Sequence, residues 1–151
     1  MGNKIYAAYG SNMNLEQMKH RCPKAKVICK GELQGYKLTF RGRKTGVANI
    51  ERSNKARVPI VLWEITKECE LALDRYENYP MLYKKEVVEI STPDGERTAM
   101  LYVMVRQYQG MPVMPSEHYF GIIRQGYKDN EINTTPLTRA LKCTRDEIVN
   151  Q

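Results

Sequence analysis

The chain has 151 residues, of which 42% are hydrophobic and 27% charged, and its 24 Lys and Arg against 17 Asp and Glu leave a net charge of +7. This length favours one domain, and no apolar run approaches the roughly 20 residues of a membrane span. The two histidines and four cysteines have neither metal-ligand nor C-x-x-C spacing, which excludes a zinc ribbon, a thioredoxin-type redox pair and a histidine-rich metal site. The amino terminus lacks a signal-peptide pattern. We therefore expect a single domain over residues 1–151, located in the cytoplasm.

The amino-terminal part of the chain combines a strand pattern with a helix pattern. Residues 4–9 are a short apolar run typical of a buried strand, and turn-forming residues 10–13 follow it. Asn14 is a predicted helix N-cap, with Gln17 three residues later as in a capping box. Pro23 should end this helix by the preceding residue.

The middle of the chain has the apolar, β-branched character of strands. Residues 27–33 and 36–40 are predicted strands, joined by a hairpin turn at residues 34–35, which are Gln and Gly. A brief strand over 47–50 follows a basic, glycine-containing loop, and residues 59–65 are a strong strand prediction.

The next part contains a helix and a hairpin. Thr66 is a predicted N-cap for a helix over 67–77. Residues 83–90 and 98–104 are predicted strands of a hairpin around Pro93-Asp94-Gly95, a sequence that favours a turn.

Two further helices are predicted near the carboxyl terminus. Ser116 caps a helix over 117–125, with Gly126 at the C′ position, and Thr135-Pro136 begins a final short helix. Because the hydrophobic period switches repeatedly between two and 3.6, the chain is expected to be a mixed α/β or α+β domain.

The first candidate site is the loop after the first predicted strand. Glycine at position 10 permits a tight turn and close approach of a ligand to the backbone. The loop leads into a helix amino terminus, where N–H groups can hold a carboxylate or phosphate without a charged side chain. The alternative is an ordinary strand-to-helix turn in which Ser11 and Asn12 are turn formers.

The second candidate site is the end of the helix over 67–77. Its apolar stripe consists of Cys69, Ala72, Leu73 and Tyr76, with Glu77 at the edge of the stripe and Asp74 directed to solvent. A carboxylate beside the core and at the negative end of a helix dipole has a raised pKa, which suits a general base near neutral pH. The alternative is a surface glutamate paired with one of the basic residues Lys84, Lys85 or Arg75.

Together with further motifs, these two segments resemble the gamma-glutamylcyclotransferase-like superfamily. The resemblance begins with Y-G-S-N-M at residues 9–13 and includes L-D-R-Y-E-N-Y-P-x-x-Y at residues 73–83. The other matching motifs are C-P at 22–23, G-x-L-x-G-Y-x-L-x-F at 31–40, V-x-W-E-I-T at 61–66 and P-S-x-x-Y at 115–119. Y-G-S-N followed in order by L-D-x-x-E is a strong signature of this superfamily.

The resemblance implies a fold, a reaction and a set of site residues. The implied fold is α+β, a mixed and partly closed β-barrel with flanking short helices. In the implied reaction the α-amine of a γ-glutamyl group attacks its own γ-carbonyl, which releases 5-oxoproline and an amine or amino acid without a metal or other cofactor. The implied catalytic acid/base is Glu77, and the implied substrate-binding residues are Tyr9, Gly10, Ser11, Asn12, Met13, Tyr83 and Tyr119. Asn78 stands where this family usually has a glycine, which adds a side chain beside the site.

Two other functions stay open. A non-catalytic module that binds a γ-glutamyl group or another small anion on the same scaffold is the main alternative, because fold does not determine function. A nucleic-acid-binding role would use the basic region over 36–58, but its aromatic residues alternate as the core of a strand would. We therefore expect a small γ-glutamyl substrate and neither nucleic acid nor a membrane as partners. Homodimers occur in such families, although no stretch of this sequence identifies an interface.

Overall fold

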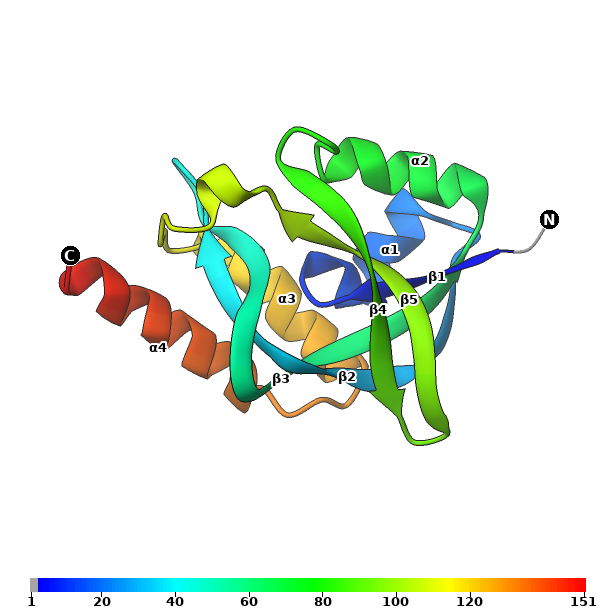
Figure 1. Ribbon diagram of the computed structural model, residues 1–151. Helices are drawn as coiled ribbons and strands as arrows, with labels where there is room; N and C mark the ends of the chain where they lie inside the picture. The colour runs from blue at the N-terminus through cyan, green and yellow to red at the C-terminus, as the bar shows by residue number, and fades with distance from the viewer. Residues whose placement is uncertain (1–2) are drawn as a thin grey trace.

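Five strands close into a β-barrel in the computed structural model, which describes residues 3–151 (Figure 1). The single-domain prediction also includes Met1 and Gly2, which lie outside the described residues. The order of the strands around the barrel is β1-β3-β2-β4-β5. Their bounds are β1 Lys4–Ala8, β2 Lys26–Arg41, β3 Val47–Ile65, β4 Tyr83–Thr92 and β5 Gly95–Met104.

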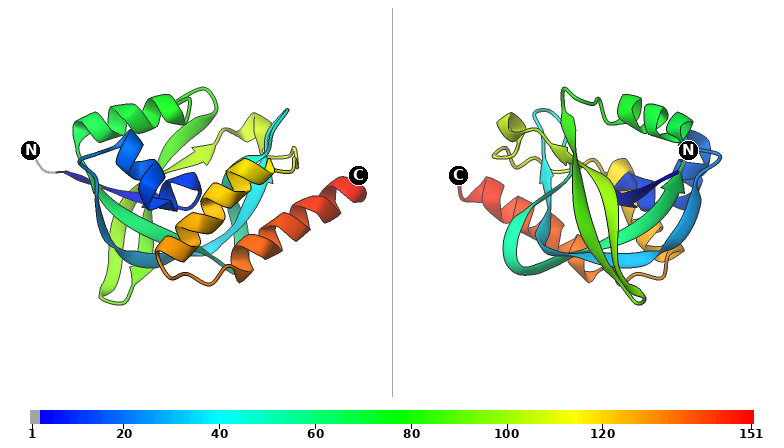
Figure 2. Two further views of the ribbon diagram at one scale, coloured as in Figure 1. Left: turned by 180° about the vertical axis from the view of Figure 1, so that it is seen from behind. Right: turned by 45° about the vertical axis from the view of Figure 1, so that its right-hand side comes forward.

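The barrel closes through a parallel pair. Neighbouring strands are antiparallel except for β1 and β5, which pair in parallel with Tyr6 opposite Met100. Four α-helices in the described chain flank the barrel: α1 Leu15–Arg21, α2 Lys67–Tyr76, α3 Glu117–Asp129 and α4 Thr135–Val149. Figure 2 shows α3 and α4 following one another along the outside of the barrel. This arrangement confirms the α+β class and the mixed barrel with flanking helices.

The hairpin predicted at residues 34–35 is wrong, because β2 continues through both residues to Arg41. Gly35 has a φ of 80°, and the pairing of β2 with β3 shifts register between Gln34 and Tyr36. A glycine with positive φ suits a bulge as well as a turn, so the same residue bends a long strand instead of reversing it. The strands predicted over 47–50 and 59–65 are likewise the two ends of β3.

Several predicted ends of elements are confirmed. Asn14 caps α1 by accepting a hydrogen bond from the Gln17 N–H, and that helix ends at Arg21. Thr66 caps α2 through the Cys69 N–H. The predicted β4–β5 hairpin forms around Pro93-Asp94-Gly95. Among the helices described in residues 3–151, none is long and apolar enough to cross a membrane.

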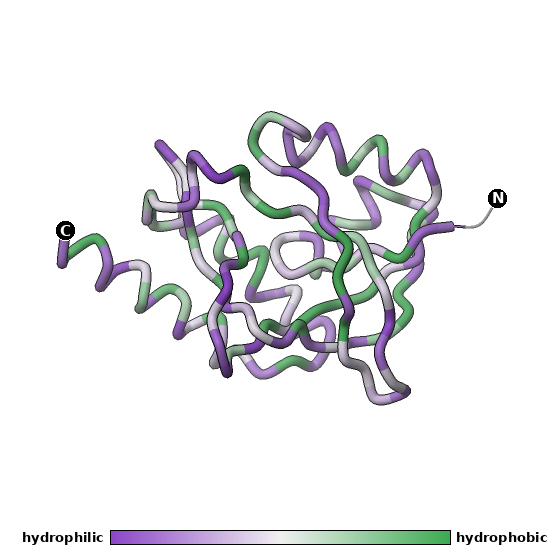
Figure 3. Tube along the Cα trace, viewed as in Figure 1, coloured by the Kyte–Doolittle hydropathy of each residue, from purple (hydrophilic) through white to green (hydrophobic). Residues whose placement is uncertain are grey.

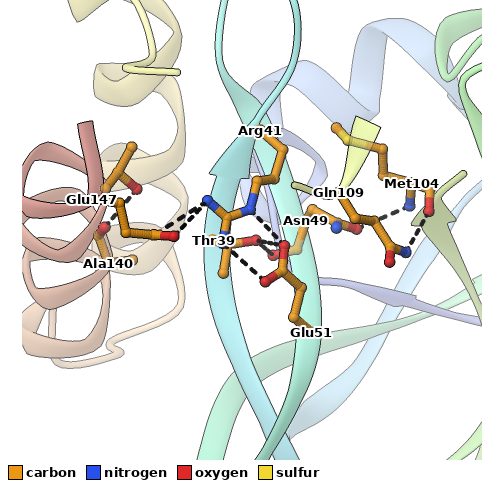
Figure 4. Close-up of polar contacts among 9 residues, drawn as sticks. Thr39, Arg41, Asn49, Glu51, Met104, Gln109, Ala140 and Glu147 are labelled. Carbon is orange, nitrogen blue, oxygen red and sulfur yellow. Dashed lines mark hydrogen bonds and ion pairs between the residues drawn. The ribbon is translucent and has the colours of Figure 1, made fainter. Parts of the chain in front are cut away.

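A buried arginine links the last helix to the barrel (Figure 4). Arg41 on β2 is 4% exposed, and its Nε and Nη2 donate to the Glu51 carboxylate on β3 at 2.6 and 2.9 Å. Its Nη1 donates to Glu147 of α4 at 3.1 Å. A buried cation needs such partners. The same helix, α4, also buries the apolar side chains of Leu137 and Ala140. Its hydrophobic and hydrophilic residues alternate along the turns (Figure 3).

Gly126 has a different role from the one predicted, because α3 continues past it to Asp129. It is a buried interior residue of the helix, at the contact with the turn that follows β1. A Cβ on Gly126 would lie 2.7 Å from the Asn14 backbone nitrogen and 2.8 Å from the Met13 carbonyl carbon. The glycine therefore lets α3 support this turn at close range.

We predict that Gly126→Ala destabilises the protein because its Cβ would collide with backbone atoms. The expected loss in the free energy of unfolding is about 1–3 kcal/mol, as for other overpacked sites. Gly121→Ala is the matched control, since Gly121 lies in the same helix and an added Cβ there would have no neighbouring atom within 4 Å. That change should leave stability equal or raise it by up to about 1 kcal/mol. Urea unfolding measures both, and equal stability of the two variants would contradict the close-packing role.

Candidate active site

A pocket of about 230 Å³ lies where β1 and β5 end and where β3 and β4 begin. Its walls are largely tyrosine: Tyr6, Tyr9, Tyr76, Tyr83, Tyr102 and Tyr119. Of the predicted site residues, the pocket brings together Tyr9, Gly10, Ser11, Asn12, Glu77, Tyr83 and Tyr119. Two segments far apart in the sequence, the turn after β1 and the end of α2, thus face one cavity.

Met13 is the exception among the predicted site residues. Its side chain is fully buried and does not line the pocket. Its N–H donates to the Gly10 carbonyl at 3.1 Å, within the 3₁₀ turn Ser11–Met13. The expectation that Met13 offers a backbone donor to a substrate is therefore not met, because that donor closes the turn.

The turn presents backbone donors toward the pocket. Among residues 3–151, the N–H groups of Gly10, Ser11 and Asn12 have no protein acceptor. Gly10 allows the turn to approach β3, since a Cβ there would lie 3.2 Å from the Cβ of Ala48. Unpaired N–H groups at such a turn can bind an anionic group of a ligand.

Glu77 is the C-cap residue of α2, and its N–H bonds to the Leu73 carbonyl at 2.8 Å. Its half-buried carboxyl lines the pocket and has no hydrogen bond or ion pair with any residue of the described chain, 3–151. Burial raises the pKa of Glu77 to about 7, and the positive charge of Arg21 partly opposes that rise. A carboxyl in this state exchanges a proton near neutral pH.

The surface-glutamate alternative is wrong, because the basic residues considered as its partners are engaged elsewhere or make no ion pair with it. Lys85 pairs with Glu70 and Asp74, and Lys84 pairs with Glu86. Asp74 also differs from its prediction: it accepts a hydrogen bond of 2.6 Å from the Tyr102 hydroxyl and does not simply face solvent.

Asn78 makes the turn that follows Glu77. It has a φ of 54°, a conformation that asparagine tolerates better than most residues. Its N–H donates to the Arg75 carbonyl at 3.2 Å. The residue is exposed and is not part of the pocket lining. The side chain that replaces the usual glycine therefore stays outside the cavity.

The tyrosine hydroxyls divide into two kinds. Those of Tyr9 and Tyr83 donate to the carbonyls of Tyr102 and Ala48 at 2.5 and 2.6 Å, so they can only accept from a ligand. The Tyr119 hydroxyl accepts the Ala48 N–H at 3.0 Å, and the Tyr6 hydroxyl accepts from the Asn12 amide at 3.0 Å.

The protons of Tyr6 and Tyr119 have no acceptor within residues 3–151. Burial raises the pKa of both hydroxyls, so they keep those protons at neutral pH. Both can therefore donate to a ligand.

Reasoning from the sequence missed Tyr6, Tyr76 and Tyr102 as pocket residues. Tyr6 lies on β1, the strand that leads to the turn, and strand alternation could have indicated it. Tyr76 belongs to the predicted apolar stripe of α2, but it is 41% exposed and its hydroxyl lies 2.9 Å from Ser11 Oγ. Tyr102 reaches the pocket only because the barrel closes, which no local pattern indicates.

A larger groove of about 1190 Å³ runs between β2, β3 and α4. None of the predicted site residues lines it. Charges of both signs lie along it, and one pair, Arg57 and Glu32, is 3.4 Å apart. The predicted site residues therefore line the smaller cavity and not this groove.

Comparisons with known proteins agree on one family. The model of the family "Gamma-glutamyl cyclotransferase, AIG2-like" matches residues 6–121. Human gamma-glutamylcyclotransferase is 31% identical over 135 residues, which is 83% of this chain and 71% of the human protein. The mouse protein of the same name is 30% identical with the same coverage.

A solved structure of a gamma-glutamyl cyclotransferase superposes with a TM-score of 0.80 at 31% identity, covering 93% of this chain and 86% of that one. A second structure, of an uncharacterized human protein, superposes with a TM-score of 0.81 at 32% identity, covering 94% and 88%. The matched residues 6–121 include both the Y-G-S-N turn and Glu77. On the family match, the relatives and the fold together, the chain belongs to the AIG2-like gamma-glutamyl cyclotransferases, a family of cyclotransferase-type enzymes.

Proposed function

We propose that this protein cyclises the γ-glutamyl group of a small substrate, releasing 5-oxoproline and an amine or amino acid. One observation carries the proposal: the Glu77 carboxyl has no protein partner in the described chain and lines a tyrosine-walled pocket together with a turn of free N–H groups. Membership of the cyclotransferase family supports the reaction type.

The reaction requires two proton transfers, and one carboxylate can perform both. The substrate α-amine arrives as an ammonium and must lose a proton before its lone pair can attack the γ-carbonyl. Glu77 takes that proton, and the nitrogen loses its second excess proton to solvent as the carbon–nitrogen bond of the ring forms. It then returns a proton to the leaving nitrogen as the original amide bond breaks. A pKa of about 7 suits both steps, because the group accepts and releases protons at similar free-energy cost near neutral pH.

The rest of the pocket supports binding and orientation. The N–H groups of Gly10 and Ser11 can hold the substrate α-carboxylate, and the hydroxyls of Tyr6 or Tyr119 can donate to the oxyanion that develops on the γ-carbonyl. A pocket of about 230 Å³ suits a folded γ-glutamyl group. Holding amine and carbonyl together is a large contribution, since well-oriented intramolecular reactions reach effective molarities of about 10⁵–10⁸ M.

We predict that Glu77→Gln lowers kcat by about 10²–10⁴-fold while the protein stays folded, because the amide cannot transfer the protons. The measurement is 5-oxoproline release from a panel of γ-glutamyl amines and γ-glutamyl amino acids. Glu68→Gln is the control, since Glu68 is an 83% exposed side chain on the same helix. Near-normal turnover by Glu77→Gln would overturn the assignment.

The same assay separates catalysis from binding alone. The wild-type protein could release no 5-oxoproline from any compound of the panel and still show a thermal shift with γ-glutamyl compounds. That result would identify a binding module on this scaffold instead. Release from one class of substrate would identify the leaving group.

Glu77 should also leave a signature in stability that needs no substrate. Its pKa in the folded protein is about 7, above the ordinary 4.5, so the folded state binds the proton more tightly than the unfolded state does. Ionisation of the carboxyl therefore costs stability. The cost is absent below pH 4.5, grows as the pH rises toward 7 and is complete above it, at roughly 3 kcal/mol. The free energy of unfolding of Glu77→Gln should therefore increase relative to that of wild type as the pH rises from 5 to 8, by up to roughly 3 kcal/mol. Thermal unfolding of both proteins across this pH range measures the difference. A difference in stability between the two proteins that is independent of pH would contradict the buried carboxyl.

A further inference from the structure

Arg21, the last residue of α1, makes three contacts around the active-site turn. Its Nη1 donates to Asn12 Oδ1 at 2.6 Å, and its Nη2 donates to Gln17 Oε1 at 2.7 Å. Its guanidinium carbon lies 3.4 Å from the centroid of the Tyr76 ring, in a stacked cation–π position. A planar fork with two fixed donors and a stacking face is a geometry that arginine alone provides.

Two of the residues that Arg21 contacts line the pocket and come from different segments of the chain. Asn12 is 2% exposed, its amide donates to the Tyr6 hydroxyl, and its carbonyl accepts from Trp63 Nε1 at 3.1 Å. Tyr76 immediately precedes Glu77, and its hydroxyl lies 2.9 Å from Ser11 Oγ. Arg21 therefore connects the turn after β1 to the end of α2 without lining the pocket itself.

The positive charge of Arg21 also interacts electrostatically with the Glu77 carboxyl. The groups that act electrostatically with Glu77 from the other elements are tyrosine hydroxyls: Tyr6 and Tyr9 at β1, Tyr83 on β4, Tyr102 on β5 and Tyr119 on α3. Burial raises the pKa of each, so they are neutral at pH 7. On α2 itself, Asp74 is paired with Lys85 and Arg75 is exposed. Within the described chain, Arg21 is the cation that lowers the pKa of Glu77 against the effect of burial.

We propose that Arg21 is a positioning residue of this active site, which joins the turn containing Asn12 to the Tyr76 ring and places its positive charge near the Glu77 carboxyl. This inference rests on the proposed role of Glu77 as the proton-transfer group. In it, the fork of Arg21 keeps the backbone donors of the turn aligned with the carboxyl. Its charge keeps enough carboxylate present at neutral pH to accept the proton of the substrate ammonium.

The charge is tested without substrate. The pKa of Glu77 is measured by NMR of ¹³C-labelled glutamate carboxyls in wild type, Arg21→Gln and Arg75→Gln, with Glu77→Gln assigning the resonance. We expect the Glu77 pKa to rise in Arg21→Gln and to stay at the wild-type value in Arg75→Gln, which removes the same charge from an exposed site on α2. An unchanged pKa in Arg21→Gln, or an equal rise in both variants, would overturn the inference.

The fork is tested by Arg21→Lys, which keeps the charge but loses the planar donor pair. In 5-oxoproline release we expect kcat to fall roughly 10- to 100-fold, as for small misplacements of catalytic groups, while the acid limb of the pH–kcat profile stays in place. In Arg21→Gln that limb should also move to higher pH. Wild-type kcat in Arg21→Lys would overturn the positioning role, and this variant decides it even where Arg21→Gln does not fold.

The two parts of the experiment also separate this inference from the proposed function. A wild-type protein that releases no 5-oxoproline counts against the proposed reaction, whereas the Glu77 pKa in Arg21→Gln is read from the same protein in the absence of turnover. A rise there supports the electrostatic link between Arg21 and Glu77, and its absence contradicts that link.

Discussion

Closure of the barrel by the parallel β1–β5 pair is the constraint on which the site depends. The pair places the end of β1 beside the end of β5, and β5 in turn lies antiparallel to β4, so that the start of β4 reaches the same edge. The turn after β1 then faces the segment between β3 and β4, which contains α2 and Glu77. Without closure, the two halves of the pocket would belong to different edges of an open sheet.

The pocket places a carboxyl group in surroundings that disfavour its charged form. Glu77 is at the negative end of α2, is half-buried in the wall of the pocket and has no counterion in direct contact among the described residues. Such a group is costly to ionise, and sites that break a local rule at a cost in stability are typical of functional positions. Tyrosines suit this place since they supply apolar surface and hydroxyl groups without a second charge.

A layer of supporting contacts holds the walls of the pocket from outside. Gly126 lets α3 approach the turn closely, Trp63 and Arg21 hydrogen-bond to Asn12, and the Tyr83 and Tyr119 hydroxyls bond to the backbone of Ala48. These groups come from α1, α3, β3 and β4, so several separate elements support the walls. Each of these hydrogen bonds ties a wall of the pocket to a separate part of the fold, which favours a preorganised site.

Part of this structure could be predicted from the amino-acid sequence alone, because it depends on interactions between residues close together in the chain. The caps Asn14 and Thr66, the β4–β5 turn and the α+β class follow from short-range rules of hydrogen bonding and periodicity. The resemblance of the motifs around Tyr9 and Glu77 to those of the cyclotransferase family, and not a local rule, indicated that these two segments share a site. Gly35 and Gly126 show where such rules stop: a glycine permits a turn, a bulge, a helix end or a close contact, and only the partner segment decides which one forms. The tertiary structure alone decided that Met13 faces the core, that Tyr6 and Tyr102 face the pocket and that Arg21 lies over the Tyr76 ring, because each depends on which distant strand or helix packs there.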